Sequence, residues 1–361
     1  MNKFVTSALA LSVAGSLAYA GTSDGEWLEL DREIASLATP VTSTAPGGIN
    51  WSALIRVNEV FSSDFMVGAE DLSGVSFTDI DLAASGQVAD YTWRISGDFE
   101  AGVLVLEDAY AAWQCGDMLG AMIGNFKPNT LRSATVSPEN LLFPSRTAIG
   151  STFDGWDAGI GVNGSFEDML MYSLSVLNGA NGAASDHAYY FRAEYNLGEG
   201  AANVEGALGA GDDLAATIGI LYANFDDLSG TGGDDSVYGF DVNGTAGQFG
   251  FGLEWLNIDD GIASGTDEDF LGGFTGLVFD PDSNPWDVTV SFLINEELEA
   301  GLRYEDTDNG DSAKATSLVL NWYQSGHNAK WQFGVTDVSS DVDADEGKLW
   351  TAGLTLGSSG N

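Results

Sequence analysis

The sequence predicts an all-β fold, a transmembrane antiparallel β-barrel of about sixteen strands with a short N-terminal helix or coiled-coil segment. The first observation is a period of two from residue 50 onwards, as in Tyr91–Glu100, where apolar and polar residues alternate. The second is the content of the two faces: aromatic residues lie towards strand ends on the apolar face, and glycine, small or charged residues fill the other. This distribution is typical of a wet lumen and favours a barrel over a soluble sandwich or β-helix.

Residues 1–20 are predicted to be a secretory signal peptide. Lys3 precedes an apolar run, Phe4–Leu17, and the segment ends in the small-x-small sequence Ala18-Tyr19-Ala20. The run is shorter than the ~18 residues that a membrane anchor needs, so cleavage after Ala20 is the expectation. The chain is therefore expected to be exported.

Residues 21–49 are predicted to hold a short helix and a linker. In Glu26–Leu37, Trp27, Leu30, Ile34 and Leu37 follow the spacing of a helix-pairing seam. This pattern fits either a short oligomerisation coil or an amphipathic helix packed on its own domain. Two prolines and two glycines then mark residues 39–50 as a linker.

Residues 50–361 are assigned to the barrel. Alternating segments begin near residues 50, 75, 91, 106, 118, 155, 169, 187, 213, 236, 248, 269, 286, 297, 315, 329 and 348, and at least one of them is in doubt. With sixteen strands, roughly 19–20 residues remain for each strand and its connection, and an outer-membrane strand uses about 9–11 of them. That leaves room for alternating short turns and long loops.

One connection, residues 127–154, differs from the others because it is proline-bearing, partly apolar and basic on balance. Such a loop is expected to fold into the lumen and narrow it. Four further arginines lie in mid-strand on polar faces, where each either contacts solutes or pairs with a lumen carboxylate. The candidate constriction and lumen residues are Lys127, Arg132, Arg146, Arg56, Arg94, Arg192, Arg303 and Glu139.

The net charge of −42 comes mainly from acidic residues in the connections. So acidic a chain is a poor ligand for nucleic acid. Asp341, Asp343 and Asp345 have the spacing of a calcium loop, but Gly347 comes one place late and Ala352 stands where a glutamate is needed. No cofactor is expected, and the acidic loops are expected to bind Ca²⁺ weakly at most.

Catalytic signatures are missing from the sequence. His187 and His327 follow no recognisable nucleophile motif, and the single cysteine, Cys115, excludes a disulfide framework or a multi-cysteine metal site. An enzyme is therefore not expected.

The stretch Leu106–Ser151 resembles part of the phosphate-selective porins, the porin O/P family. The matching positions are Asp108–Tyr110, Gly124–Lys127 followed by Pro128, and Phe143–Arg146. The resemblance implies sixteen antiparallel strands, a trimeric assembly in the bacterial outer membrane and an inward loop that constricts the pore.

These observations predict an outer-membrane porin, a passive channel for small hydrophilic solutes or ions. It is expected to be weakly selective, with a basic constriction loop below an acidic mouth. The expected partners are the solutes, outer-membrane lipid and two further copies in a homotrimer. The alternative is a structural or adhesive surface barrel whose acidic loops bind cations.

Overall fold

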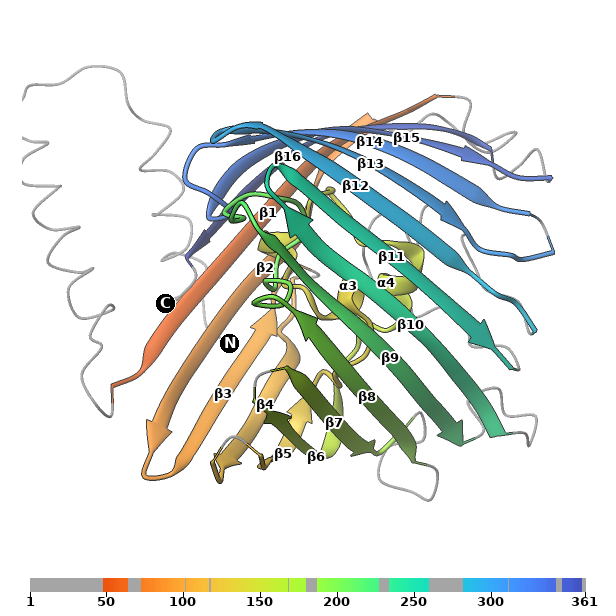
Figure 1. Cartoon of the computed structure of the whole chain (residues 1–361). Coiled ribbons are helices and arrows are strands. Elements are labelled where there is room, and N and C mark those ends of the chain that lie inside the picture. The colour runs from red at the N-terminus through yellow and green to blue at the C-terminus, as the bar shows by residue number, and fades with distance from the viewer. Residues whose placement is uncertain are drawn as a thin grey trace, which may run out of the picture. The chain divides into compact units, whose positions relative to one another are not determined.

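The computed structural model describes residues 48–63, 73–100, 102–116, 118–167, 169–179, 187–226, 234–259, 282–310, 312–341 and 346–358. Within these ranges the chain forms one closed barrel of sixteen antiparallel strands (Figure 1). Every strand pairs with its neighbours in sequence, and the first strand pairs with the last. The all-β barrel predicted from the two-residue period is confirmed.

The elements have the following bounds. The strands are β1 (Asn50–Ser63), β2 (Ser73–Val88), β3 (Tyr91–Asp98), β4 (Val105–Gln114), β5 (Gly120–Phe126), β6 (Asp157–Phe166), β7 (Leu170–Leu177), β8 (Ala188–Leu197), β9 (Leu214–Asp226), β10 (Asp234–Ala246), β11 (Phe249–Ile258), β12 (Trp286–Asn295), β13 (Leu298–Asp306), β14 (Lys314–Tyr323), β15 (Ala329–Ser339) and β16 (Gly347–Ser358). The short helices α3 (Arg132–Thr135), η1 (Pro138–Asn140) and α4 (Ala148–Thr152) lie between β5 and β6.

Alternation along each strand separates an apolar outer face from a polar inner face, as β14 illustrates. Its exposed residues are Thr316, Leu318, Leu320 and Trp322, and its buried residues are Ala315, Ser317, Val319, Asn321 and Tyr323. Successive side chains point to opposite sides of a strand, so one row faces outwards and the next faces the lumen. The outer row is the one that lipid would contact.

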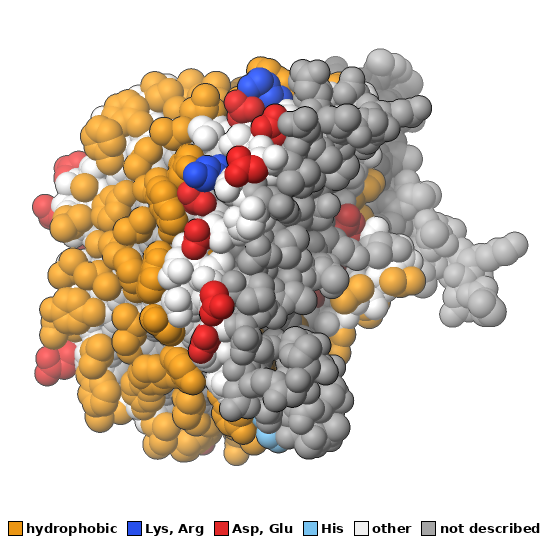
Figure 2. All heavy atoms as spheres, turned by 90° about the vertical axis from the view of Figure 1, so that its right-hand side faces the viewer, with side chains coloured by type: hydrophobic (Ala, Val, Ile, Leu, Met, Phe, Trp, Pro, Cys, Tyr) orange, Lys and Arg blue, Asp and Glu red, His pale blue; other side chains and the backbone are white. Residues whose placement is uncertain are grey.

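The outer wall is rich in hydrophobic side chains. Figure 2 shows them covering much of the barrel wall, with acidic and basic residues gathered in a strip beside the undescribed part. Exposed leucine, isoleucine, phenylalanine and tryptophan occur on strands all around the barrel, including Ile123, Ile220, Phe292 and Trp350. A closed sheet with such a surface leaves no unpaired backbone edge, which a hydrocarbon environment requires.

The barrel closes where β1 pairs with β16 over the register Ala53–Ser358 to Ser63–Lys348. On the inner side of this seam Arg56 lies opposite Thr355, and Thr355 lies opposite Lys330 of β15. The first strand and the last two strands therefore carry neighbouring polar side chains into the lumen.

Several parts of the sequence analysis concern residues outside the described ranges. These are the signal peptide, residues 1–20, the helix over 26–37, the acidic residues 260–269 and the alternating segment near 269. None of the helices in the described ranges is long and apolar enough to cross a membrane.

Candidate pore

The connection between β5 and β6 enters the barrel and is called here the inward segment, residues 127–154. Figure 1 shows its helices α3 and α4 inside the ring of strands. Pro128, Pro138 and Pro144 interrupt it, which favours a succession of short turns over a continuous helix. The segment therefore follows the lumen wall in several short pieces.

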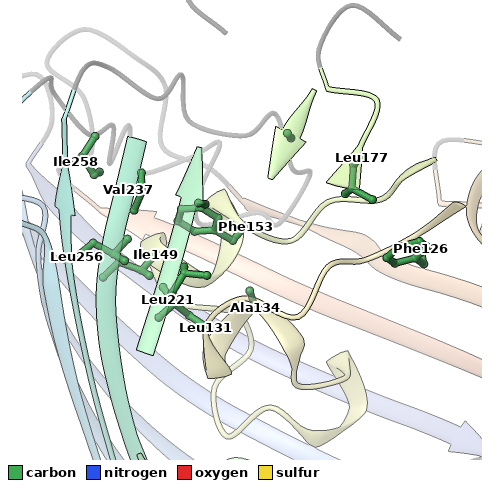
Figure 3. Close-up of a cluster of buried hydrophobic side chains, with 12 residues drawn as sticks. Phe126, Leu131, Ala134, Ile149, Phe153, Leu177, Leu221, Val237, Leu256 and Ile258 are labelled. Atoms are coloured by element: carbon green, nitrogen blue, oxygen red, sulfur yellow. The ribbon is translucent and has the colours of Figure 1, made fainter. Parts of the chain in front are cut away.

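Apolar packing attaches one side of the inward segment to the wall. Leu131, Ala134, Ile149 and Phe153 join a buried cluster with residues of β9, β10 and β11 (Figure 3). The wall partners are Leu221, Ala223, Val237, Leu256 and Ile258. Burial of apolar surface stabilises this arrangement, so the inner face of these strands is a packed core and not a wet lining.

Polar side chains of β1 and β13–β15 hold the tip of the segment against the wall. The Leu142 carbonyl accepts hydrogen bonds from Asn321 Nδ2 at 2.8 Å and Gln332 Nε2 at 2.9 Å. Nearby tip carbonyls accept further bonds from basic side chains: Leu141 from Lys330 Nζ, Pro144 from Arg56 Nη2, and Ser145 from Arg303 Nη1. Donors from β1, β13, β14 and β15 thus satisfy carbonyls that would otherwise be buried without partners.

Wall carboxylates accept hydrogen bonds from the backbone amides of the same segment. Glu254 Oε1 accepts from Ser133 N at 2.8 Å, and Glu305 Oε2 accepts from Ala148 N at 2.7 Å. Hydrogen bonds to an ionised acceptor are stronger than neutral ones. The amides that begin the two short helices are therefore fixed by acidic residues of the barrel.

Asp154 links two basic residues within the segment. It forms ion pairs with both Lys127 and Arg146, and Arg146 Nη1 also donates to the carbonyls of Ser133 at 2.7 Å and Val136 at 2.6 Å. The Lys127 ammonium lies 4.0 Å from the centre of the Trp156 ring. Arg146 is buried, and its guanidinium connects Ser133 and Val136 near the start of the segment with Asp154 at its end.

Five lumen carboxylates lie at the same level on the strands from β8 to β13. Each strand contributes one of them except β9, which has Gly219 at this position. This carboxylate row consists of Glu194, Asp241, Glu254, Asp287 and Glu305. Arg192 bonds two of them, with Nε 2.6 Å from Glu194 Oε1 and Nη1 2.5 Å from Asp241 Oδ2. Arg303 Nε lies 3.0 Å from Glu305 Oε1. Its guanidinium also stacks over Phe143 of the tip, 4.4 Å from the ring centre.

A second connection, residues 198–213 between β8 and β9, also contacts the inward segment. Glu205 N donates to Asn140 O at 3.0 Å, and Glu205 Oε2 accepts from Leu142 N at 2.9 Å. Arg132 Nη2 lies 3.5 Å from the Ala201 carbonyl oxygen. Residues of this stretch were not among the pore residues predicted from the sequence.

Open space remains on the other side of the lumen. A cavity of about 470 Å³ lies between β1–β4 and β16 on the wall and Thr135–Glu139 of the inward segment. A second, of about 340 Å³, lies against β4–β8 beside Asn129. Lys127 lines both cavities.

The predicted site residues divide into two groups by exposure. The Arg94 side chain is 39% exposed and pairs with Asp108 at 2.7 Å, whereas the side chains of Arg146, Arg192 and Arg303 are each 1% exposed. Arg56 is equally enclosed and pairs with Asp79 at 2.8 Å. Only the less buried cations can offer charge to a solute.

The larger cavity is lined by side chains of both signs. Its charged residues are Arg94, Lys127, Asp81, Glu107, Asp108 and Glu139. Four carboxylates thus face two cations across the same space. A mixed lining of this kind acts on ions of either sign.

Cys115 is exposed, and His327 lies on the turn between β14 and β15, beside the Tyr323 ring. Within the described ranges, no group of three or more His, Cys, Asp or Glu side chains is arranged to hold a metal ion. Ca²⁺ binding at the acidic loops stays a prediction.

No protein-family model and no curated protein matches the sequence. Solved structures do match the fold. One is Salmonella typhi OmpF in complex with daunomycin, with a TM-score of 0.61 and 12% identity over 87% of this chain and 98% of that chain. The trimer form of Vibrio cholerae OmpT has a TM-score of 0.59 and 11% identity over 87% and 100%. The outer membrane channel DcaP of Acinetobacter baumannii has a TM-score of 0.57 and 12% identity over 88% and 99%. At these identities the similarity establishes the fold, a porin-type barrel of nearly full length.

Proposed function

We propose that this chain is a bacterial outer-membrane channel through which small hydrophilic solutes and ions diffuse passively. The observation that carries the proposal is the lumen. An apolar outer wall encloses an inward segment that is fixed to one side, and a cavity of about 470 Å³ lies on the other. Such a channel needs no chemistry, because width and lining charge decide what passes. The fold similarity to a protein named an outer membrane channel supports the same reading.

Selectivity is proposed to be weak. Of the cations predicted to line the lumen, Arg94 and Lys127 line the larger cavity, and both are paired with carboxylates, Asp108 and Asp154. Glu139 adds negative charge to the same cavity. Because charges in a narrow lumen are screened less than exposed loop charges, this lining favours cations modestly. The buried arginines are proposed mainly to hold the inward segment and the lumen carboxylates in place. These are Arg56, Arg146, Arg192 and Arg303.

Assembly and relationship are part of the proposal. A homotrimer is favoured by the fold similarity to a protein whose structure is described as a trimer form. A relationship to the phosphate-selective porins rests on residues 106–151 alone. The alternative of an adhesive barrel depends on acidic loops that lie partly outside the described ranges.

The test is conductance of the purified, refolded protein in a planar bilayer. Stepwise current increases are expected in KCl, with a reversal potential slightly on the cation side in a salt gradient. A gel shift on boiling and a β-type circular dichroism spectrum would establish that the barrel is folded. Folded protein that produces no current steps would contradict the channel and favour a structural role.

A further inference from the structure

The inward segment and the β8–β9 connection, residues 198–213, enter the lumen from opposite ends. Consecutive strands run antiparallel all around the barrel, so connections that follow odd-numbered strands lie at one end and those that follow even-numbered strands lie at the other. The inward segment follows β5, whereas the second connection follows β8. Their contact therefore lies within the barrel, away from either rim.

Four hydrogen bonds join the two segments, one of them between Arg132 Nη2 and the Ala201 carbonyl. Glu205 N donates to Asn140 O at 3.0 Å, and Asn140 Nδ2 donates to the Asn203 carbonyl at 3.1 Å. The Glu205 carboxylate accepts from Leu142 N at 2.9 Å. Leu142 is wholly buried and its carbonyl is held by β14 and β15. Glu205 thus holds the amide side of a residue whose carbonyl side is fixed to the wall.

The second connection is also fitted closely to the wall. Ala207 N donates to Glu299 Oε1 at 2.6 Å, and Ala207 is wholly buried. Gly206 has φ +88°, and a Cβ there would lie 2.6 Å from Glu299 Oε1. A Cβ on Gly250 of β11 would lie 2.7 Å from the Gly206 carbonyl carbon. Because the backbone approaches its neighbours closely at both glycines, the connection is packed in a defined conformation against the wall.

Together the two segments fill one side of the lumen. The cavity that they share with β10, β11 and β12 is only about 40 Å³. The cavities on the other side are about 470 and 340 Å³. Solutes are thereby confined to the β1–β8 side.

We propose that the β8–β9 connection is a second constriction element. It closes the β10–β12 side of the lumen to solutes, and Glu205 is a positioning residue that holds the tip of the inward segment. The inference rests on the proposed channel function, and it adds that the size limit for solutes is set from both ends of the barrel. Neither segment alone would fix the width of the passage.

A shortened connection tests the proposal directly. Replacing residues 199–212 by Asn-Gly, which suits a tight turn between antiparallel strands, removes the second element and leaves the inward segment intact. The expected result is a rise of about twofold in single-channel conductance, and entry of larger neutral sugars in a liposome swelling assay. Gel mobility before and after boiling reports whether the variant barrel has folded.

Point variants keep the test decisive if the shortened protein does not fold. Glu205→Ala removes the acceptor for Leu142 N, and Asp212→Ala makes the same charge change at an exposed position of the same connection. Glu205→Ala should raise the conductance and broaden its distribution, whereas Asp212→Ala should match the wild type. A merely structural role for Glu205 would lower thermal stability without moving the sugar size limit.

The outcomes separate the two proposals. Suppose that the wild type conducts and that both the shortened chain and Glu205→Ala keep its conductance and size limit. The proposal of a second constriction element is then wrong, and the proposal of a channel is retained. If only the shortened chain conducts, the connection is a barrier and passive diffusion through the native protein is wrong. If no folded variant conducts, both proposals fail.

Discussion

Glu254 of β11 and Asp287 of β12 lie directly opposite one another in the barrel, with both side chains buried on the lumen side. Ser133 donates to Glu254 from its amide and its hydroxyl. Asp287 Oδ2, in contrast, has no hydrogen-bond partner among the described residues. Neighbouring buried carboxylates disfavour each other's ionised form. Asp287 is therefore expected to lower the stability of the folded barrel.

Asp287→Asn is therefore expected to stabilise the barrel. Removing the ability to carry a buried like charge should raise the free energy of unfolding by about 1 kcal/mol or more, measured by denaturant titration in detergent at neutral pH. Glu194→Gln is the matched control in the same row, because Glu194 is bonded to Arg192 and its neutralisation should destabilise. Equal losses in both variants would contradict the assignment.

Arg146→Met should detach the inward segment. The change leaves the carbonyls of Ser133 and Val136 without their buried donor, which costs about 1–3 kcal/mol for each, while Asp154 keeps its pair with Lys127. Thermal unfolding should shift downwards, and current recordings should become noisier. Lys348→Met breaks a pair whose side chains are 50% and 57% exposed, and it should change the stability by less than about 1 kcal/mol. Similar effects from the two substitutions would be inconsistent with a clamp.

Neutralising carboxylates of the larger cavity should change ion preference. Glu139→Gln removes a negative charge from its lining, and the cation-to-anion permeability ratio should fall about twofold in a reversal-potential measurement. Asp337→Asn, at an exposed position, should have a smaller effect that disappears at high salt. If Asp337→Asn had the greater effect, the outer rim and not the cavity would govern selectivity.

His327 predicts a pH dependence of stability. Burial, assisted by nearby Lys330, lowers the pKa of His327 from 6.5 to about 3. Between these values the unfolded chain binds more protons than the folded chain, so the free energy of unfolding should fall as the pH drops below 6.5. The loss approaches about 1 kcal/mol per pH unit and is absent above pH 6.5. His327→Gln should flatten this slope, and an unchanged slope would show that His327 is not responsible.

The barrel wall was predictable because each strand carries its own signal. Tyr91–Asp98 and residues 249–255 alternate strictly, and their predicted starts, near 91 and 248, agree with β3 and β11. One further alternating stretch, near 269, lies outside the described ranges. Alternation is a local property of a half-buried strand, so it is readable without knowing the partners.

The interior was less predictable because its contacts join distant residues. Arg192 and Asp241 are 49 positions apart, and Lys330 reaches a carbonyl 189 positions away. Nothing in the local sequence marks which carboxylate an arginine will meet. The role of the β8–β9 connection was not predicted because it too depends on distant contacts. Gly206 packs against Glu299, and Glu205 accepts a hydrogen bond from Leu142.

The seam between β1 and β16 has a consequence for how the protein assembles. Arg56, near the start of the barrel sequence, and Lys330, on its penultimate strand, both donate to carbonyls at the tip of a segment from its middle. Arg56 on β1 and Lys330 on β15 lie on either side of Thr355 on β16. Both donors therefore reach the tip only when the first and last strands pair. A sheet that closed without the tip would bury the Lys330 ammonium without its Leu141 acceptor, so the tip favours closure of the ring.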